Sequence, residues 1–259
     1  MRDRLKCAIL SVTVFAASCS TSFAQKSDQQ TKAAATGNSR DLSGVWVTKR
    51  ETNGAALVDP KLRPPMTSWA QARFDAAVPS IGPRAVAGKE NDPNLKCYPD
   101  GIPKILTSPE PFEIVTTQDK ILMLFEKDHG WRQIWTNGEK LPDDPDPTYD
   151  GYSVGKWEGD TFVVESNGFN DRIWLDYLGD PRSESLHLTE RYQRIDHDTL
   201  SITVTIDDPK AYTQPWVGKP KLYVLKPNWK IMEWYCTPDD ITIFDKDVRI
   251  PSGTPHDHN

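Results

Sequence analysis

The segment Gly151–Phe169 constrains the fold of this 259-residue chain more than any other. Two runs rich in β-branched and aromatic residues, Tyr152–Trp157 and Thr161–Ser166, flank the corner Glu158-Gly159-Asp160. Glycine and aspartate tolerate positive φ angles, and such a corner between two extended runs is typical of a β-hairpin. The segment therefore predicts two adjacent antiparallel strands.

The same pattern recurs along much of the chain. Extended runs alternate with short turn sequences, which gives roughly ten strands at the spacing of about 8–12 residues found in β-sandwiches and barrels. We therefore predict an all-β fold in which an antiparallel meander closes into a barrel. The other predicted strands are Leu42–Val47, Glu113–Thr117, Lys120–Glu126, Trp131–Thr136, His187–Ile195, Thr199–Ile206, Lys221–Lys226 and Trp229–Cys236.

A long proline-rich insert follows the first predicted strand. Residues 52–112 hold ten of the 21 prolines. Because proline lacks the backbone N–H, this region cannot form a central part of a sheet. One short helix is predicted over Ser68–Ala77, capped by Thr67 or Ser68. A long structured loop in a compact domain often covers a site, so the insert is predicted to act as a lid.

The start of the chain has the three parts of a signal peptide. Residues 1–24 combine a basic start, an apolar centre at Ala8–Ala17 and a small-x-small cleavage site at Ser22-Phe23-Ala24. Export to the periplasm as a soluble protein is the prediction. A lipoprotein anchored through Cys19 fits less well, because residues 15–18 lack the leucine expected before the small residues. No later segment approaches the ~20 apolar residues of a membrane span.

Composition divides the remainder of the chain into three parts. Residues 25–40 are polar and have too few apolar side chains for a core, which predicts a disordered tether. Residues 41–240 suit one large β-barrel domain. Residues 241–259 are predicted to form a C-terminal tail.

Charge and cysteine content narrow the partners and the compartment. The chain has a net charge of −6, and loss of the signal peptide, which carries a net +2, would leave −8. An acidic chain without a lysine or arginine cluster argues against nucleic acids and anionic membranes as partners. Cys97 and Cys236 would be the cysteines of the exported chain, and a disulfide between them is the simplest expectation in an oxidising compartment. Two buried free thiols are the alternative.

Four motifs carry a family resemblance: Leu-Ser-Gly-x-Trp at Leu42–Trp46, the hairpin sequence Tyr152–Thr161, Thr189–Tyr192 and Asp207–Trp216. With them the chain resembles a family of exported bacterial proteins, which implies a shared fold and export but no established activity. Many members of that family have histidine where this chain has Tyr152 and Arg182, so the resemblance implies no histidine chemistry at these positions. Gly44-Val45-Trp46 ahead of a meander is also similar to the lipocalin and fatty-acid-binding architecture, which implies a calycin-like barrel.

Common catalytic and cofactor motifs are missing from the sequence. It contains no HExxH or CxxC motif, no phosphate-binding loop and no dinucleotide fingerprint, so neither a metal site nor a cofactor is predicted. The residues Gly151–Gly155 have Gly-x-Ser-x-Gly spacing, but a nucleophile elbow requires a strand-to-helix turn, and no helix follows here.

The candidate site is instead a set of arginine, tyrosine and acidic residues on predicted strands. Leu188, Glu190, Tyr192 and Arg194 share one strand face, which is either a polar barrel interior or a solvated outer wall. In an interior, shielding from water shifts pKa values towards useful ranges. The ordinary alternative is an arginine–glutamate pair that braces the barrel. The predicted acid–base groups are Tyr152, His187 and Glu190, and the predicted ligand-binding groups are Arg132, Arg191, Tyr192, Asp207, Tyr212, Trp174 and Trp216, the last two as exposed rings near the barrel mouth.

These features favour a periplasmic barrel that holds a small aromatic or carboxylated molecule. In this interpretation Arg132 or Arg191 would bind an anionic group of the ligand. If the protein is an enzyme, the expected chemistry is a cofactor-independent acid–base reaction, as in a lyase, decarboxylase or isomerase. The alternative is a structural or interaction protein of the cell envelope, with the proline-rich insert and the acidic surface as its binding face.

Overall fold

The computed structural model describes residues 39–49, 54, 56, 57 and 59–237. The predicted signal peptide (1–24), nearly all of the predicted tether (25–40) and the predicted C-terminal tail (241–259) lie outside the described residues.

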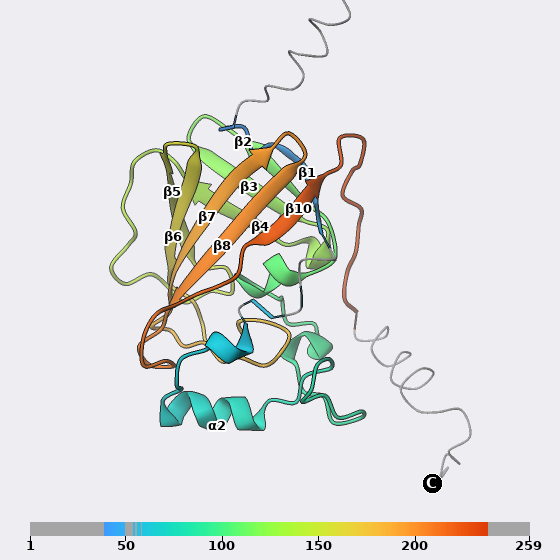
Figure 1. Cartoon of the computed structure of the whole chain (residues 1–259), viewed down its shortest axis with the longest axis vertical. Coiled ribbons are helices and arrows are strands. Elements are labelled where there is room, and N and C mark those ends of the chain that lie inside the picture. The colour runs from blue at the N-terminus through green and yellow to red at the C-terminus, as the bar shows by residue number, and fades with distance from the viewer. Residues whose placement is uncertain (1–38, 50–53, 55, 58, 238–259) are drawn as a thin grey trace, which may run out of the picture. The chain divides into compact units, whose positions relative to one another are not determined.

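Ten strands form one sheet, in the order β10-β1-β2-β3-β4-β5-β6-β7-β8-β9, and a further pairing of β10 with β8 closes nine of them into a barrel (Figure 1). The tenth strand, β9, pairs with the end of β8 beyond the stretch that β10 occupies. The predicted all-β, calycin-like barrel is thus confirmed. The strands are β1 (Gly44–Thr48), β2 (Phe112–Thr116), β3 (Lys120–Phe125), β4 (Trp131–Trp135), β5 (Tyr152–Glu158), β6 (Thr161–Asn167), β7 (His187–Asp196), β8 (Thr199–Asp207), β9 (Trp216–Val217) and β10 (Lys221–Leu225).

One neighbouring pair departs from the predicted antiparallel pattern. Strands β4 and β5 run parallel and meet at a single register position, Trp135 opposite Val154. Parallel neighbours need a connection of about a dozen or more residues, and residues 136–151 are long enough to return the chain to the starting end of β4. The residues of β4 before Trp135 and those of β5 before Val154 are not paired with each other. The barrel wall is open over this stretch.

The last predicted strand, Trp229–Cys236, is wrong. This segment is irregular, and the backbone N–H of Met232 donates to the Glu126 carboxylate at 2.8 Å instead of to a neighbouring strand. Strand β10 already uses both of its edges, one for β1 and one for β8. No edge of β10 is left to accept another strand, which explains the difference.

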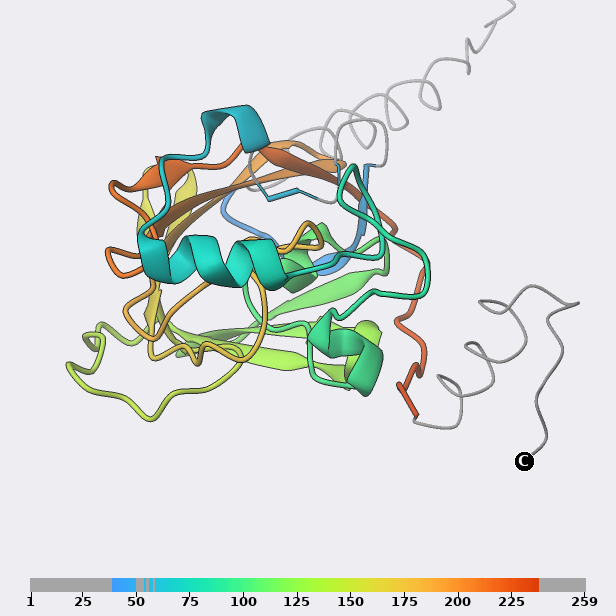
Figure 2. The ribbon, with the colours of Figure 1, turned by 90° about the horizontal axis from the view of Figure 1, so that it is seen from below.

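The insert closes one end of the barrel. Its helix α2 (Ser68–Ala76) begins at Thr67, whose hydroxyl accepts a hydrogen bond from the Ala70 backbone, as predicted for the cap. Figure 2 shows α2 and the neighbouring loops lying across this end. Ile102 and Leu106 are buried in the same apolar core as the barrel residues. Three short 3₁₀ turns, η1 (Pro60–Leu62), η2 (Pro93–Lys96) and η3 (Lys104–Thr107), complete the insert, and η4 (Lys127–His129) links β3 to β4.

The core follows the strand alternation. In β8 the side chains of Leu200, Ile202, Val204 and Ile206 are buried, whereas the intervening threonines and serine are partly exposed. In β1, Trp46 is fully buried and its indole N–H donates to the Leu42 carbonyl at 2.9 Å. The apolar run of each strand thus faces a single interior.

The predicted disulfide is present between Cys97 and Cys236, whose Cα atoms are 5.4 Å apart. It closes a loop with a sequence separation of 139 in the unfolded chain. In the folded protein, only the short segment between the end of β10 and Cys236 has to be held in place by the disulfide. Forming the bond there therefore costs little entropy. The entropy of closing a loop depends logarithmically on its length. From this dependence, we expect the free energy of unfolding of the Cys97→Ser/Cys236→Ser variant to be about 2 kcal/mol lower than that of the wild type. Urea denaturation would measure it; an unchanged midpoint would contradict this account.

Candidate functional site

The barrel interior holds a buried ion pair. Arg132 of β4 and Glu190 of β7 point inwards and are 2% and 0% exposed. The two guanidinium Nη atoms of Arg132 donate to both carboxylate oxygens of Glu190, at 3.0 Å for Nη1. Burial alone would lower the pKa of Arg132, but the charge of Glu190, together with its hydrogen bond and the smaller effects of Tyr192 and Asp150, outweighs burial and raises that pKa. Tyr192 adds a third contact, because its hydroxyl donates to Glu190 at 2.9 Å.

Two serines complete this interior network. The Ser153 hydroxyl of β5 accepts from Nε and Nη2 of Arg132 at 3.1 and 3.0 Å. The Ser166 hydroxyl of β6 accepts from Nη2 at 2.8 Å and lies 2.9 Å from that of Ser153. Every guanidinium nitrogen therefore already has an acceptor inside the protein. The network fits a brace between β4, β5, β6 and β7 better than a binding site for a free anion.

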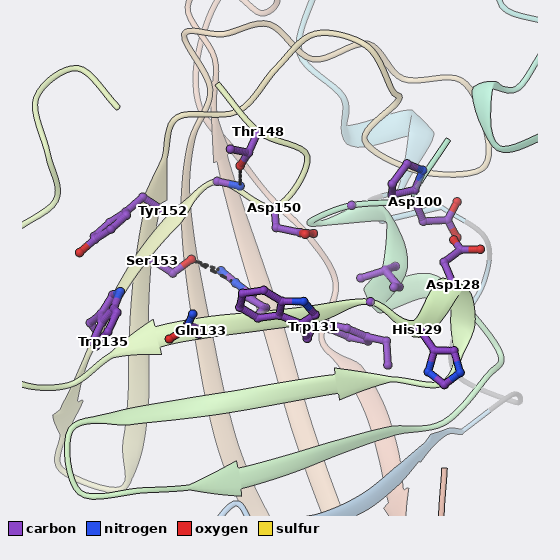
Figure 3. Close-up of a pocket in the computed structure, with 17 residues that line it drawn as sticks. Asp100, Asp128, His129, Trp131, Gln133, Trp135, Thr148, Asp150, Tyr152 and Ser153 are labelled. Atoms are coloured by element: carbon purple, nitrogen blue, oxygen red, sulfur yellow. Dashed lines mark hydrogen bonds between the residues drawn. The ribbon is translucent and has the colours of Figure 1, made fainter. Parts of the chain in front are cut away.

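A cavity of about 550 Å³ lies beside this network, where β4 and β5 are not paired (Figure 3). We call it the wall pocket. Trp131, Trp135 and Tyr152 line it with aromatic rings, and Trp131 is 59% exposed. Arg132 and Ser153 also belong to its lining, so it reaches the edge of the interior network. The other lining residues are Pro99, Asp100, Gly101, Ile105, Phe125, Asp128, His129, Gly130, Gln133, Thr148, Asp150 and Gly151.

Two aspartates give the wall pocket its acid–base groups. Figure 3 shows the Asp150 side chain projecting from the segment before β5 towards the side where Asp100 and Asp128 lie. Burial raises the pKa of Asp150, and the charges of Arg132 and Arg182 only partly oppose this shift. Burial, and then the charge of Asp100, also raise the pKa of Asp128. Both carboxyl groups are therefore poised to gain a proton more readily than exposed aspartates.

Asp128 has two further unusual features. Its backbone adopts a left-handed conformation with φ of 58°, which is uncommon for a residue with a side chain. Its Oδ2 atom is buried and has no hydrogen-bond partner among the described residues. A buried acceptor left unbonded costs about 1–3 kcal/mol, so this oxygen is suited to receive a donor from a ligand.

The third lining aspartate, Asp100, already has two lysines as counter-ions. It lies 3.2 Å from the ammonium of Lys104 and 3.3 Å from that of Lys127, and the Tyr177 hydroxyl donates to it. Lys104 is fully buried and also contacts Asp92 at 2.6 Å. Burial would raise the pKa of Asp100, but the two lysines outweigh burial and lower it. Asp100 therefore remains ionised as part of a structural cluster behind the pocket.

The structure brings together only some of the sequence-predicted site residues. Arg132, Glu190 and Tyr192 meet in the barrel interior, which decides between the two faces that the sequence left open. Tyr152 lies on the rim of the wall pocket, where its hydroxyl donates to the Glu139 carboxylate. That contact, with a smaller contribution from burial, raises the pKa of Tyr152 to about 12.

His187 and Arg191 are on the outer surface, contrary to the expectation that they join the same site. Their positions alternate with Leu188 and Glu190 along β7, so their side chains point away from the interior. The His187 ring is 4.0 Å from Glu165, and Arg191 lies 3.3 Å from Glu158. Neither residue lines the wall pocket.

The remaining four predicted residues are in other places, and none of them lines the wall pocket. Trp216 is 5% exposed and packs on Tyr212 with ring centroids 4.7 Å apart, so it is not an exposed ring at a barrel mouth. The Tyr212 hydroxyl donates to the Pro181 carbonyl at 2.8 Å. Trp174 is half-buried and forms a bridge with Pro181, whereas Asp207 is exposed at the end of β8. The loops that carry these rings dock onto the barrel end, which explains their burial.

Apart from Arg132 and Tyr152, sequence reasoning missed the residues that form the wall pocket. Trp131 and Trp135 flank Arg132 at alternate positions, so an inward Arg132 requires both rings to face outwards. That alternation was the available signal, but tryptophan usually indicates core. Asp128 and Asp150 lie in connecting segments, where nothing in the sequence separates them from ordinary solvated acids.

The described residues show neither a cluster of metal ligands nor a helix that could span a membrane. Within them, no group of three or more histidine, cysteine, aspartate or glutamate side chains is arranged to hold a metal ion. No helix in the described ranges is both long and apolar enough to cross a bilayer.

Comparison of the chain with protein-family models, with curated proteins and with solved structures finds no match.

Proposed function

We propose that this protein binds a small aromatic molecule in the wall pocket and does so in the periplasm. The observation that carries the proposal is the cavity of about 550 Å³ bordered by Trp131, Trp135 and Tyr152. Ligand pockets commonly measure about 300–1,000 Å³ and combine aromatic walls with a few polar groups. The exposed Trp131 ring offers a face on which an aromatic ligand can stack.

The interior network argues against the carboxylated ligand that the sequence also suggested. Arg132 is the arginine of the pocket lining, and its guanidinium is already occupied by Glu190, Ser153 and Ser166. A ligand carboxylate would have to displace Glu190 from a buried ion pair. Arg191, the other arginine considered for this role, is on the outer surface.

The proposal extends to proton transfer in the same pocket. The pKa values of Asp128 and Asp150 are raised by burial, so these carboxyl groups hold a proton more readily than exposed aspartates, as an acid–base group does. Tyr152, with a pKa of about 12, keeps its proton at neutral pH and can donate it. We therefore place a cofactor-independent acid–base reaction, of lyase or isomerase type, at Asp150 rather than at His187. Consumption of a small molecule retained by protein purified from its own host would test this step.

The proposed location and family rest on separate support. A disulfide between Cys97 and Cys236 is stable in oxidising compartments such as the periplasm. The hairpin β5–β6, whose sequence carries the resemblance to exported bacterial proteins, is formed with Glu158 and Thr161 paired at its turn. Membership of that family is part of the proposal. Detection of the chain in a periplasmic extract, cleaved after Ala24, would test the export.

Replacement of Trp131 tests the binding proposal. We expect benzyl alcohol, a neutral aromatic probe, to shift the indole N–H signals of Trp131 and Trp135 in an NMR titration. Trp131→Ala removes a stacking surface, so the dissociation constant is expected to rise about three- to tenfold. Trp229→Ala is the matched control, because Trp229 is 53% exposed but does not line the pocket. An equal effect of both variants, or no saturable shift at Trp131, would contradict the proposal.

A role as an envelope interaction protein is the second candidate, and one surface favours it. The segment after β10 exposes four large apolar or aromatic side chains, which are Trp229, Met232, Trp234 and Tyr235. Contiguous exposed apolar surface often marks a protein contact. Copurification of an envelope protein that is lost in Trp229→Ala and kept in Trp131→Ala would favour this candidate over the pocket.

A further inference from the structure

The unpaired charges in the wall pocket are negative. Asp128 and Asp150 line it, and neither carboxylate forms an ion pair with a lysine or arginine side chain among the described residues. The other lining aspartate, Asp100, has its own lysines. The charge of Arg132 acts on Asp150 through space, but the ion pair of Arg132 is with Glu190 and not with either aspartate.

Neighbouring cations do not change this balance. Arg182 acts on Asp150 through space, but its hydrogen bonds go to the carbonyl oxygens of Ile102, Tyr149 and Asn170 and to the Asn170 side chain. Lys127 acts on Asp128 through space, but its ion pair is with Asp100 and it is not part of the pocket lining. The side of the pocket that carries Asp128 and Asp150 therefore presents a ligand with two carboxyl groups, and no lysine or arginine of the described residues forms an ion pair with either.

The aromatic rings of the pocket also attract positively charged groups. A cation over the face of tryptophan or tyrosine is attracted by the negative face of the ring. Trp135 already attracts one in this way, since the ammonium of Lys120 lies 4.4 Å from its ring centroid. The exposed ring of Trp131 has no such partner among the described residues, and it lies in the same cavity as the two free carboxyl groups.

We infer that the wall pocket selects positively charged aromatic molecules, of the class of arylalkylamines, with the ring against Trp131 and the ammonium group towards Asp128 and Asp150. This inference rests on the proposed function and specifies its ligand class. The ammonium donors would satisfy the buried, unbonded Oδ2 of Asp128. A metal cation is a poorer fit, because no metal-binding group of side chains occurs in the described part of the chain.

Three probes of similar size test the charge preference: benzylamine, benzyl alcohol and benzoate, which are positive, neutral and negative at pH 7. Their dissociation constants would be measured by NMR titration of the full exported chain at low ionic strength. We expect benzylamine to bind about tenfold or more tightly than benzyl alcohol, and benzoate to bind most weakly. The preference should shrink as salt is added, because ions screen charge interactions.

The variants Asp150→Asn and Asp128→Asn test the assigned carboxyl groups. Each is expected to weaken benzylamine binding about tenfold and to change benzyl alcohol binding less than about twofold, because only the charge is removed. Asp146→Asn is the matched control: it removes the same charge from an exposed position in the segment before β5, outside the pocket lining. Thermal unfolding of each variant would verify that it folds.

The outcomes separate the two proposals. Equal affinity for the three probes, tighter binding of benzoate, or an effect of Asp146→Asn as large as that of Asp150→Asn would overturn the cation inference. In those cases, binding that still depends on Trp131 would leave the proposed aromatic pocket intact. Absence of saturable binding by all three probes would overturn both.

Discussion

Glu190→Gln is expected to lower the free energy of unfolding by about 3–5 kcal/mol, because it leaves the guanidinium of Arg132 buried without a counter-charge. Arg132 and Glu190 are 2% and 0% exposed, so water cannot replace the lost carboxylate. The remaining acceptors are the hydroxyls of Ser153, Ser166 and Tyr192, which are neutral, and the two serines hydrogen-bond to each other as well. Urea denaturation at constant pH would measure the loss.

A double variant distinguishes a brace from a catalytic group. Arg132→Met/Glu190→Leu removes both charges, and buried ion pairs can often be replaced by apolar residues of similar volume with little loss. We therefore expect the double variant to regain most of the stability lost in Glu190→Gln. It should also retain binding of benzyl alcohol, because the aromatic wall at Trp131 is unchanged. A Glu190→Gln protein that is fully stable but has lost its function would instead support the acid–base role predicted for Glu190.

Asp180→Asn is expected to change how stability depends on pH. Asp180 and Asp176 are 1% and 0% exposed and lie beside each other beneath the barrel, with Arg63 bonded to Asp180. Burial, and then the charge of Asp176, raise the pKa of Asp180 to about 8. Burial also raises the pKa of Asp176, so the two carboxyl groups hold a shared proton that the unfolded chain releases near pH 4.

This shared proton determines whether folding stability rises or falls with pH. The folded state binds it more tightly than the unfolded state does, so the stabilisation is complete below about pH 4 and is lost as the pH rises to about 8. The loss can reach about 1.4 kcal/mol per pH unit for one proton. Asp180→Asn removes the titration, so the variant should gain stability relative to the wild type between about pH 5 and pH 8, with no further gain above it. Asp144→Asn, an exposed control, should show a constant difference. A constant difference for Asp180→Asn as well would contradict the shared proton.

Features with local signals were predictable from the sequence. The hairpin β5–β6 follows from turn residues and β-formers within one short segment, and α2 follows from its cap at Thr67. Features that depend on competition between distant segments were not. Trp229–Cys236 has the composition of a strand, but barrel closure by β10 leaves it no edge to join.

The candidate site shows the same division. Strand alternation places Glu190 and Tyr192 on one face, but only the closed barrel makes that face the interior, because a strand pattern does not specify which side is enclosed. His187 and Arg191 belong to the other face for the same reason.

By itself, the sequence determined the all-β class, the short helix, the hairpin and the disulfide partners, since each follows from composition or from interactions between near neighbours. The tertiary structure alone decided where the wall pocket lies. Asp100, Asp128 and Asp150 come from three separate connecting segments, and β4 and β5 run parallel only because residues 136–151 cross back along the barrel. The physical reason is that the pocket consists of space left between segments that closure of the barrel and docking of the insert bring together. No single segment encodes that space.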